Sequence, residues 1–185
     1  MKKILFVILT TISLTAYGQD KSDYIRFNKL TEVVGTEYVI ASVENLGKML
    51  EIKKEYLLFV NTQTGETNQV DFPKDTKNIQ IEQIKIDSLG INVIVVSART
   101  FDLNEKFGID WDDPQQIIVL SSDGNEKTQL TDNEFFVRTW KVNKLSGTIV
   151  ITGHYDTNNN RKYDKTDKSE IQIYDLKTLK LIYKI

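Results

Sequence analysis

Short runs of Val, Ile, Tyr and Phe, many of them alternating with polar residues, recur along the chain from residue 37 to the C-terminus. Gly, Asn, Asp and Ser residues separate most of these runs, a pattern that predicts short β-strands joined by turns. One window, 45–56, allows a short helix, because Leu46, Met49 and Leu50 are interspersed with charged residues. The predicted strands are 37–43, 55–61, 67–72, 79–87, 91–98, 116–121, 127–131, 135–142, 148–153, 170–175 and 179–185.

Two of these runs carry further information. Along 79–86 the apolar positions change from odd to even numbers at Gln83, which predicts a bend or bulge at that residue. The run 91–96 is apolar almost throughout, which is typical of a strand covered on both faces. We therefore expect at least one strand to lie deep in the core.

Three phrases of the sequence are similar to one another. In 56–65, 117–124 and 171–178, an apolar strand enters a tight turn, and a closing strand follows each turn. Self-similarity at a roughly constant spacing is typical of repeat architectures. We predict three repeats, at about 23–73, 74–133 and 134–185, each with up to four strands in a meander.

The segments 58–65 and 173–178 resemble the third strand and turn of blades in WD40-like or TolB-like periplasmic β-propellers. This resemblance implies an all-β fold of three four-stranded, blade-like antiparallel meanders. Closed propellers have about four to eight blades, so three blades would form an open arc or be completed by dimerisation. The alternative is a β-sandwich or barrel with a similar number of strands.

The N-terminus predicts an exported protein. Lys2 and Lys3 precede the short apolar stretch 4–14, and small residues flank Tyr17 in 16–18, which is the pattern of a secretory signal peptide. The apolar stretch is shorter than the roughly 20 residues that a transmembrane helix needs. The segment 1–18 also resembles export signals of Bacteroidota. We expect a single β domain over 19–185, periplasmic or secreted, with no membrane span.

The amino-acid composition excludes several kinds of functional site and partner. The chain has 185 residues and no Cys, which excludes disulfides, a lipobox lipid anchor and a Cys nucleophile. Its single His, His154, argues against a His-rich metal site. It has 24 basic and 26 acidic residues, and this mildly acidic balance argues against nucleic acid as a partner, since nucleic-acid-binding proteins carry a clustered basic face.

One loop, 156–167, has oxygen ligands at positions 1, 3, 5, 9 and 12 and a backbone carbonyl at position 7. Ca²⁺ binds six to eight oxygens at such spacing, and the loop resembles the calcium loops of EF-hands and dockerins. Arg161 replaces the usual Gly at position 6, and Asp167 replaces the longer Glu that is usual at position 12, which predicts weak binding. The predicted flanks are strands rather than helices, and the alternative is a solvated turn. The predicted Ca²⁺ ligands are Asp156, Asn158, Asn160, Lys162, Asp164 and Asp167.

The loop 102–113 repeats this pattern one unit earlier. Its positions 1, 3, 9 and 12 are again Asp, Asn, Asp and Asp, but position 5 is Lys106, whose ammonium group would compete with a cation. We interpret 102–113 as a degenerate copy. Together these features predict a non-enzymatic binding protein with a protein or glycan partner, a structural Ca²⁺ and a potential homodimer. The alternative is a small glycosidase-like hydrolase that uses carboxylates of this loop, such as Asp112 and Asp113.

Overall fold

The structure is a computed structural model that describes residues 24–47, 52–105, 108–160 and 164–185. The predicted signal segment lies outside these residues, as does the predicted ligand Lys162. Within the described part of the chain, no helix is long and apolar enough to cross a membrane.

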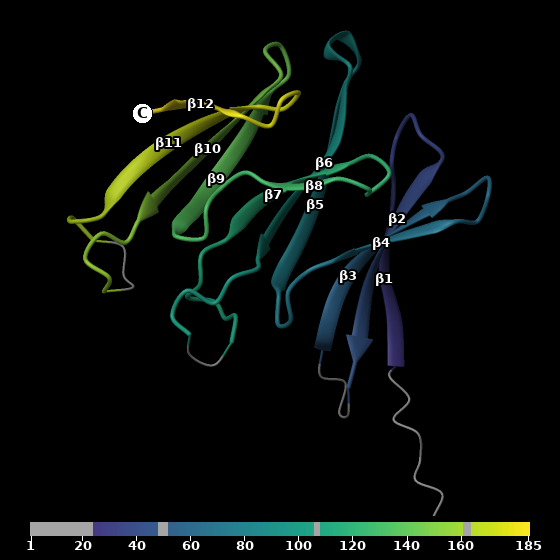
Figure 1. Cartoon of the computed structure of the whole chain (residues 1–185), viewed down its shortest axis with the longest axis horizontal. Coiled ribbons are helices and arrows are strands. Elements are labelled where there is room, and N and C mark those ends of the chain that lie inside the picture. Colours follow the sequence, from purple (N-terminus) through teal and green to yellow (C-terminus); the bar gives the residue numbers. More distant parts are fainter. Residues whose placement is uncertain (1–23, 48–51, 106–107, 161–163) are drawn as a thin grey trace, which may run out of the picture.

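The described chain forms three antiparallel sheets (Figure 1). Sheet 1 contains β1 (Tyr24–Glu32), β2 (Tyr38–Leu46), β3 (Ile52–Asn61) and β4 (Thr67–Asp71). Sheet 2 contains β5 (Lys77–Ile86), β6 (Ile91–Arg99), β7 (Gln116–Ser121) and β8 (Lys127–Gln129), with a 3₁₀ turn, η2 (Asp87–Leu89), after β5. Sheet 3 contains β9 (Phe135–Asn143), β10 (Thr148–Tyr155), β11 (Lys168–Asp175) and β12 (Leu181–Lys184).

Each sheet is a meander in which every strand pairs with the next strand of the sequence. The first strand of each sheet is one edge and the fourth strand is the other. This confirms the prediction of three four-stranded, blade-like repeats. The sandwich and barrel alternatives are wrong, because the described strands form three separate open sheets rather than two facing sheets or one closed sheet.

Sheet 2 lies between the other two sheets (Figure 1), and both of its faces are buried. One cluster joins it to sheet 1, where Ile40 and Phe59 contact a surface that includes Val96. A second cluster joins it to sheet 3 and includes Val95 and Ile151. Burying a side chain of this kind contributes about 1.5–3 kcal/mol. The prediction that 91–96 is covered on both faces is confirmed, because neighbouring residues of β6 enter different clusters.

The bulge predicted at Gln83 is wrong. The β5–β6 register runs without a break from Gln80 to Ile86, and the irregularity lies between Lys77 and Gln80. Ile81 packs against the cluster shared with sheet 1, whereas Ile84 belongs to the cluster shared with sheet 3. The change of apolar positions therefore reflects a strand that is covered on opposite faces at its two ends.

The N-terminal part of sheet 1 departs most from the sequence prediction. The helix allowed at 45–56 is wrong for the described residues, because Asn45 lies in β2 and pairs with Lys54 of β3. Strand β1 was not predicted at all. A register shift between Phe27 and Lys29 interrupts its alternation, and the interruption removes the period-2 signal that identifies a strand.

Candidate functional site

The long loops that follow β6 and β10 lie at the same end of the molecule (Figure 1). They join the second and third strands of sheets 2 and 3. Equivalent strands of successive meanders run in the same direction, so equivalent loops emerge together. The two acidic loops singled out by their sequence, 102–113 and 156–167, thus share one side of the fold.

In the loop 156–167, the predicted ligands converge on the carboxylate of Asp164. Its Oδ2 accepts hydrogen bonds from the side-chain amides of Asn158, at 3.0 Å, and of Asn160, at 2.6 Å. Its Oδ1 accepts from the backbone N–H and hydroxyl of Thr166, both at 2.7 Å. These four hydrogen bonds hold the pKa of Asp164 far below its usual range. Oδ1 of Asp156 also lies in this group, 3.1 Å from the backbone nitrogen of Asn160.

Among the described residues, the carboxylate of Asp167, unlike that of Asp164, accepts hydrogen bonds from backbone N–H groups only. Its two oxygens accept the backbone N–H groups of Thr157, at 3.3 Å, and of Asp164, at 2.7 Å. These are positions 2 and 9 of the loop, so position 12 joins its two halves. The acid at this position was predicted as a cation ligand, and in the structure it braces the loop.

The loop 102–113 has the same brace. Asp113, only 3% exposed, accepts the backbone N–H groups of Leu103, at 2.9 Å, and of Asp110, at 2.8 Å. These are again positions 2 and 9. Asp110 in turn accepts the backbone N–H of Asp112, at 2.8 Å, as Asp164 accepts that of Thr166. The predicted equivalence of the two loops thus extends to individual hydrogen bonds. Lys106 lies outside the described residues.

The donor set of 156–167 suits Ca²⁺ in kind, since it consists of carboxylate and amide groups. The amides of Asn158 and Asn160 present their N–H groups to Asp164, and a cation would take their oxygens after a half-turn of each amide. Among the described residues, no three His, Cys, Asp or Glu side chains are grouped so as to hold a metal ion. The calcium site stays a prediction.

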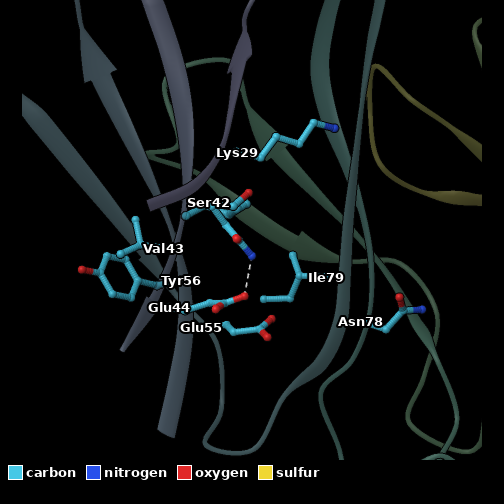
Figure 2. A pocket seen from close by; sticks show the side chains of 10 residues that line it. Lys29, Ser42, Val43, Glu44, Glu55, Tyr56, Asn78 and Ile79 are labelled. Carbon is cyan, nitrogen blue, oxygen red and sulfur yellow. Dashed lines mark hydrogen bonds between the residues drawn. The ribbon is translucent and has the colours of Figure 1, made fainter. Parts of the chain in front are cut away.

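A second candidate site is a cleft of about 250 Å³ between sheet 1 and the first strand of sheet 2. Figure 2 shows Glu44 and Glu55 pointing toward the same space from β2 and β3, whereas Tyr56 points away from it. Ile79 of β5 lies on the opposite wall (Figure 2). The adjacent Asn78 has a φ of 58°, in the left-handed region, where the β5 register is irregular. Bulges of this kind are frequent beside functional sites.

The two glutamates have opposite environments. Glu44 is 8% exposed and accepts hydrogen bonds from Arg26, at 2.9 Å from Nε, and from Asn28. Glu55 is directly opposite Glu44 in the β2–β3 register. No hydrogen bond or ion pair joins the Glu55 carboxylate to another residue that the structure describes. Burial, reinforced by the charge of Glu44, raises the pKa of Glu55, although Lys77 partly offsets this effect.

Sequence reasoning missed this pair. Glu44 lies just beyond the predicted strand 37–43. Glu55 falls inside the helical window 45–56 and also begins the predicted strand 55–61, and no register between the two strands was predicted. A correct register would have revealed them. Two acids at directly opposed positions, on the face that also carries Leu57, are an unfavourable arrangement for stability alone.

No protein-family model matches the chain, and no curated protein matches it. Among solved structures, it is similar to the Pyrococcus horikoshii acylaminoacyl peptidase in its orthorhombic crystal form, with a TM-score of 0.47 and 10% sequence identity. The match covers 88% of this chain but only 25% of the peptidase chain. Strand order and register are what establish the three blade-like sheets. The resemblance to WD40-like or TolB-like proteins and to EF-hand loops stays a prediction.

Proposed function

We propose that this protein is an exported, non-enzymatic binding protein that holds a cationic group of a protein or glycan partner in the cleft of Figure 2. The observation that carries the proposal is the carboxylate of Glu55, which is half-buried, has no hydrogen bond or ion pair within the described chain and lies opposite Glu44. Burying a charge without a partner costs free energy. A like charge directly opposite adds to that cost. A cationic ligand group would offset both costs.

The charges around the cleft favour a single ammonium group. Arg26 already balances Glu44 through an ion pair, which leaves the negative charge of Glu55, and the charge of Lys77 offsets it only in part. Lys29 also lines the cleft, but its side chain points away from the glutamates (Figure 2). The ammonium group can come from a lysine of a protein partner or from an amino sugar of a glycan. The hydroxyl of Ser42, which lines the same cleft, is placed to accept a further hydrogen bond.

The test is a calorimetric titration of the mature protein with three ligands. Two are primary amines, Nα-acetyl-lysine methylamide and glucosamine, and the third is the neutral sugar N-acetylglucosamine. We expect one amine to bind and N-acetylglucosamine not to bind. Binding should weaken at least tenfold in Glu55→Gln and stay unchanged in Glu82→Gln, a matched change at an exposed position of β5. Equal binding to Glu55→Gln, or no binding of either amine, would contradict the proposal.

A hydrolase that uses carboxylates of 102–113 has less support, because both oxygens of Asp113 accept backbone N–H groups. Turnover in a screen of chromogenic glycosides, abolished by Asp112→Asn, would overturn the non-enzymatic proposal. Export rests on the pattern of 1–18. Mass spectrometry of the exported protein should therefore find Gln19 as the first residue.

The proposal includes a structural Ca²⁺ in the loop 156–167. The ion would be held by Asp156, Asn158, Asn160, Asp164 and Asp167 together with the backbone carbonyl of Lys162, and Asp167 would also brace the loop. Bound Ca²⁺ would tie down a long exposed loop in a chain that has no disulfide. Millimolar affinity is typical of extracellular calcium modules.

A further inference from the structure

The three-sheet stack ends in a largely apolar face on sheet 1. Direct pairing places Phe27 beside Val43 and Leu30 beside Ala41, on the side of sheet 1 turned away from sheet 2. The intervening positions, such as Ile40, point into the core shared with sheet 2. Phe27 and Leu30 are 65% and 69% exposed. We call this surface the first outer face.

Sheet 3 ends the stack at the other side with a second outer face. Val150 pairs with Ile173, and Ile173 pairs with Tyr183 of β12. Ile171 exchanges two backbone hydrogen bonds with Ile185, so Ile185 lies on the same face. Tyr183 and Ile185 are 63% and 74% exposed. Ile149 and Ile151, which flank Val150 on β10, point toward sheet 2. The side chain of Val150 and those paired with it therefore point away from sheet 2.

Among the described sheets, an apolar face is covered by the apolar face of the neighbouring sheet. The Val, Ile, Leu and Phe side chains of one sheet pack against those of the next, first between sheets 1 and 2 and then between sheets 2 and 3. The second outer face continues this series, and no fourth sheet of the described residues covers it. An equivalent apolar sheet face is available on another molecule of the same protein, namely its first outer face.

The charges at the two outer faces are complementary. Glu32, opposite Val39, lies on the first outer face near the end of β1. Lys141, opposite Val150, lies on the second outer face near the end of β9. Because β1 and β9 are the first strands of equivalent meanders, packing one outer face on the other brings these opposite charges to the same end of the interface. Such pairs fix register and orientation.

We propose that a second copy of this chain covers both outer faces. The second outer face of each copy packs on the first outer face of the other, and six sheets close into a ring with a two-fold axis. Six lies within the range of about four to eight sheets found in closed rings of this kind. The cleft of Figure 2 lies on the opposite side of β2 and β3, so this inference does not depend on the proposed ligand.

The test is the mass of the mature protein in solution, by light scattering coupled to size exclusion. Leu30→Glu alters the first outer face and Tyr183→Lys alters the second. Both residues are largely exposed in the single chain, so neither change should prevent folding, which far-UV circular dichroism checks. Leu145→Glu is the matched control, since Leu145 is 91% exposed and lies in the β9–β10 turn.

We expect the wild type and Leu145→Glu to have twice the mass of one chain, and each face variant alone to have the mass of one chain. An equimolar mixture of the two face variants should regain the doubled mass, because each supplies the face that the other has lost. A monomeric wild type overturns the inference. Face variants that remain dimeric, or a mixture that remains monomeric, overturn it equally.

Discussion

Gly65 and Gly124 have almost the same left-handed backbone, with φ of 77° and 76°, but different surroundings. A Cβ on Gly65 would meet nothing within 4 Å, whereas one on Gly124 would lie 2.6 Å from a ring carbon of Phe59. Phe59 belongs to sheet 1 and Gly124 to the β7–β8 turn of sheet 2. This contact therefore reports how closely the two sheets approach.

We predict that Gly65→Ala lowers the free energy of unfolding by about 1–2 kcal/mol, the cost of a left-handed Ala. Gly124→Ala should cost about 1–3 kcal/mol more, because overpacking adds to the backbone strain. Urea denaturation of the two variants measures the difference. Equal losses of stability would mean that the β7–β8 turn does not pack against Phe59.

Glu55 gives a prediction for pH dependence. Its pKa is raised in the folded protein above the value of 4.5, so the folded state binds this proton more tightly than the unfolded state does. The stability from that proton is complete below about pH 4.5 and is lost as pH rises through the folded pKa. Glu55→Gln should therefore be more stable than the wild type at pH 7, and the difference should shrink on acidification.

Urea denaturation at pH 4 and pH 7 measures this difference, with Glu82→Gln as the control for a change at an exposed site. A Glu55→Gln variant that is less stable than the wild type at pH 7 would contradict the environment described for the cleft. The same substitution is expected to weaken amine binding at least tenfold, so stability and binding should change in opposite directions. Such a trade is typical of a group retained for function.

The two acidic loops show what a sequence pattern can reveal about an element. The spacing of 102–113 and 156–167 correctly predicted that they are equivalent, and the shared brace at position 12 confirms it. The role of that acid was not predictable from spacing, because a carboxylate can accept backbone N–H groups as well as bind a cation. The hydrogen bonds show the brace, and cation binding by Asp167 stays a prediction.

The equivalence of the loops supplies a matched control for calcium. We predict that millimolar Ca²⁺ raises the Tm of the wild type and of Asp110→Asn by a few degrees. It should leave the Tm of Asp164→Asn unchanged, because only the loop 156–167 lacks a Lys at position 5. Differential scanning calorimetry with and without chelator measures the shift. An equal shift in all three proteins, or none in the wild type, would contradict the calcium site.

The strands illustrate where local pattern succeeds and where it fails. Alternation and turn residues predicted β7 with its observed bounds, Gln116–Ser121, and placed most of the others within a few residues. Strand β1 was not predicted because its register shift breaks the alternation of apolar and polar residues. The pairing of Glu44 with Glu55 was not predicted for a related reason. Residues on two strands become neighbours only through the register between the strands, which the pattern of a single strand does not encode.

At the scale of the whole molecule, the repeat in the sequence predicted three meanders and the structure contains them. It did not predict their packing. Sheet 2 is covered on both faces, whereas among the described residues nothing covers one face of sheet 1 and one face of sheet 3, where Phe27 and Tyr183 are exposed large hydrophobic side chains. An open apolar face of this kind in a globular protein is typical of an interaction site. A second copy of the chain would cover both faces.

Small-angle X-ray scattering of the wild-type mature protein tests this claim most directly. Face-to-face closure of six sheets predicts a flat, compact particle with twice the mass of one chain and a depression at its centre. Pairing through the exposed edge strands β1 or β12 would instead give an elongated particle of the same mass. A compact dimer would support the ring, and an elongated dimer or a particle with the mass of one chain would contradict it.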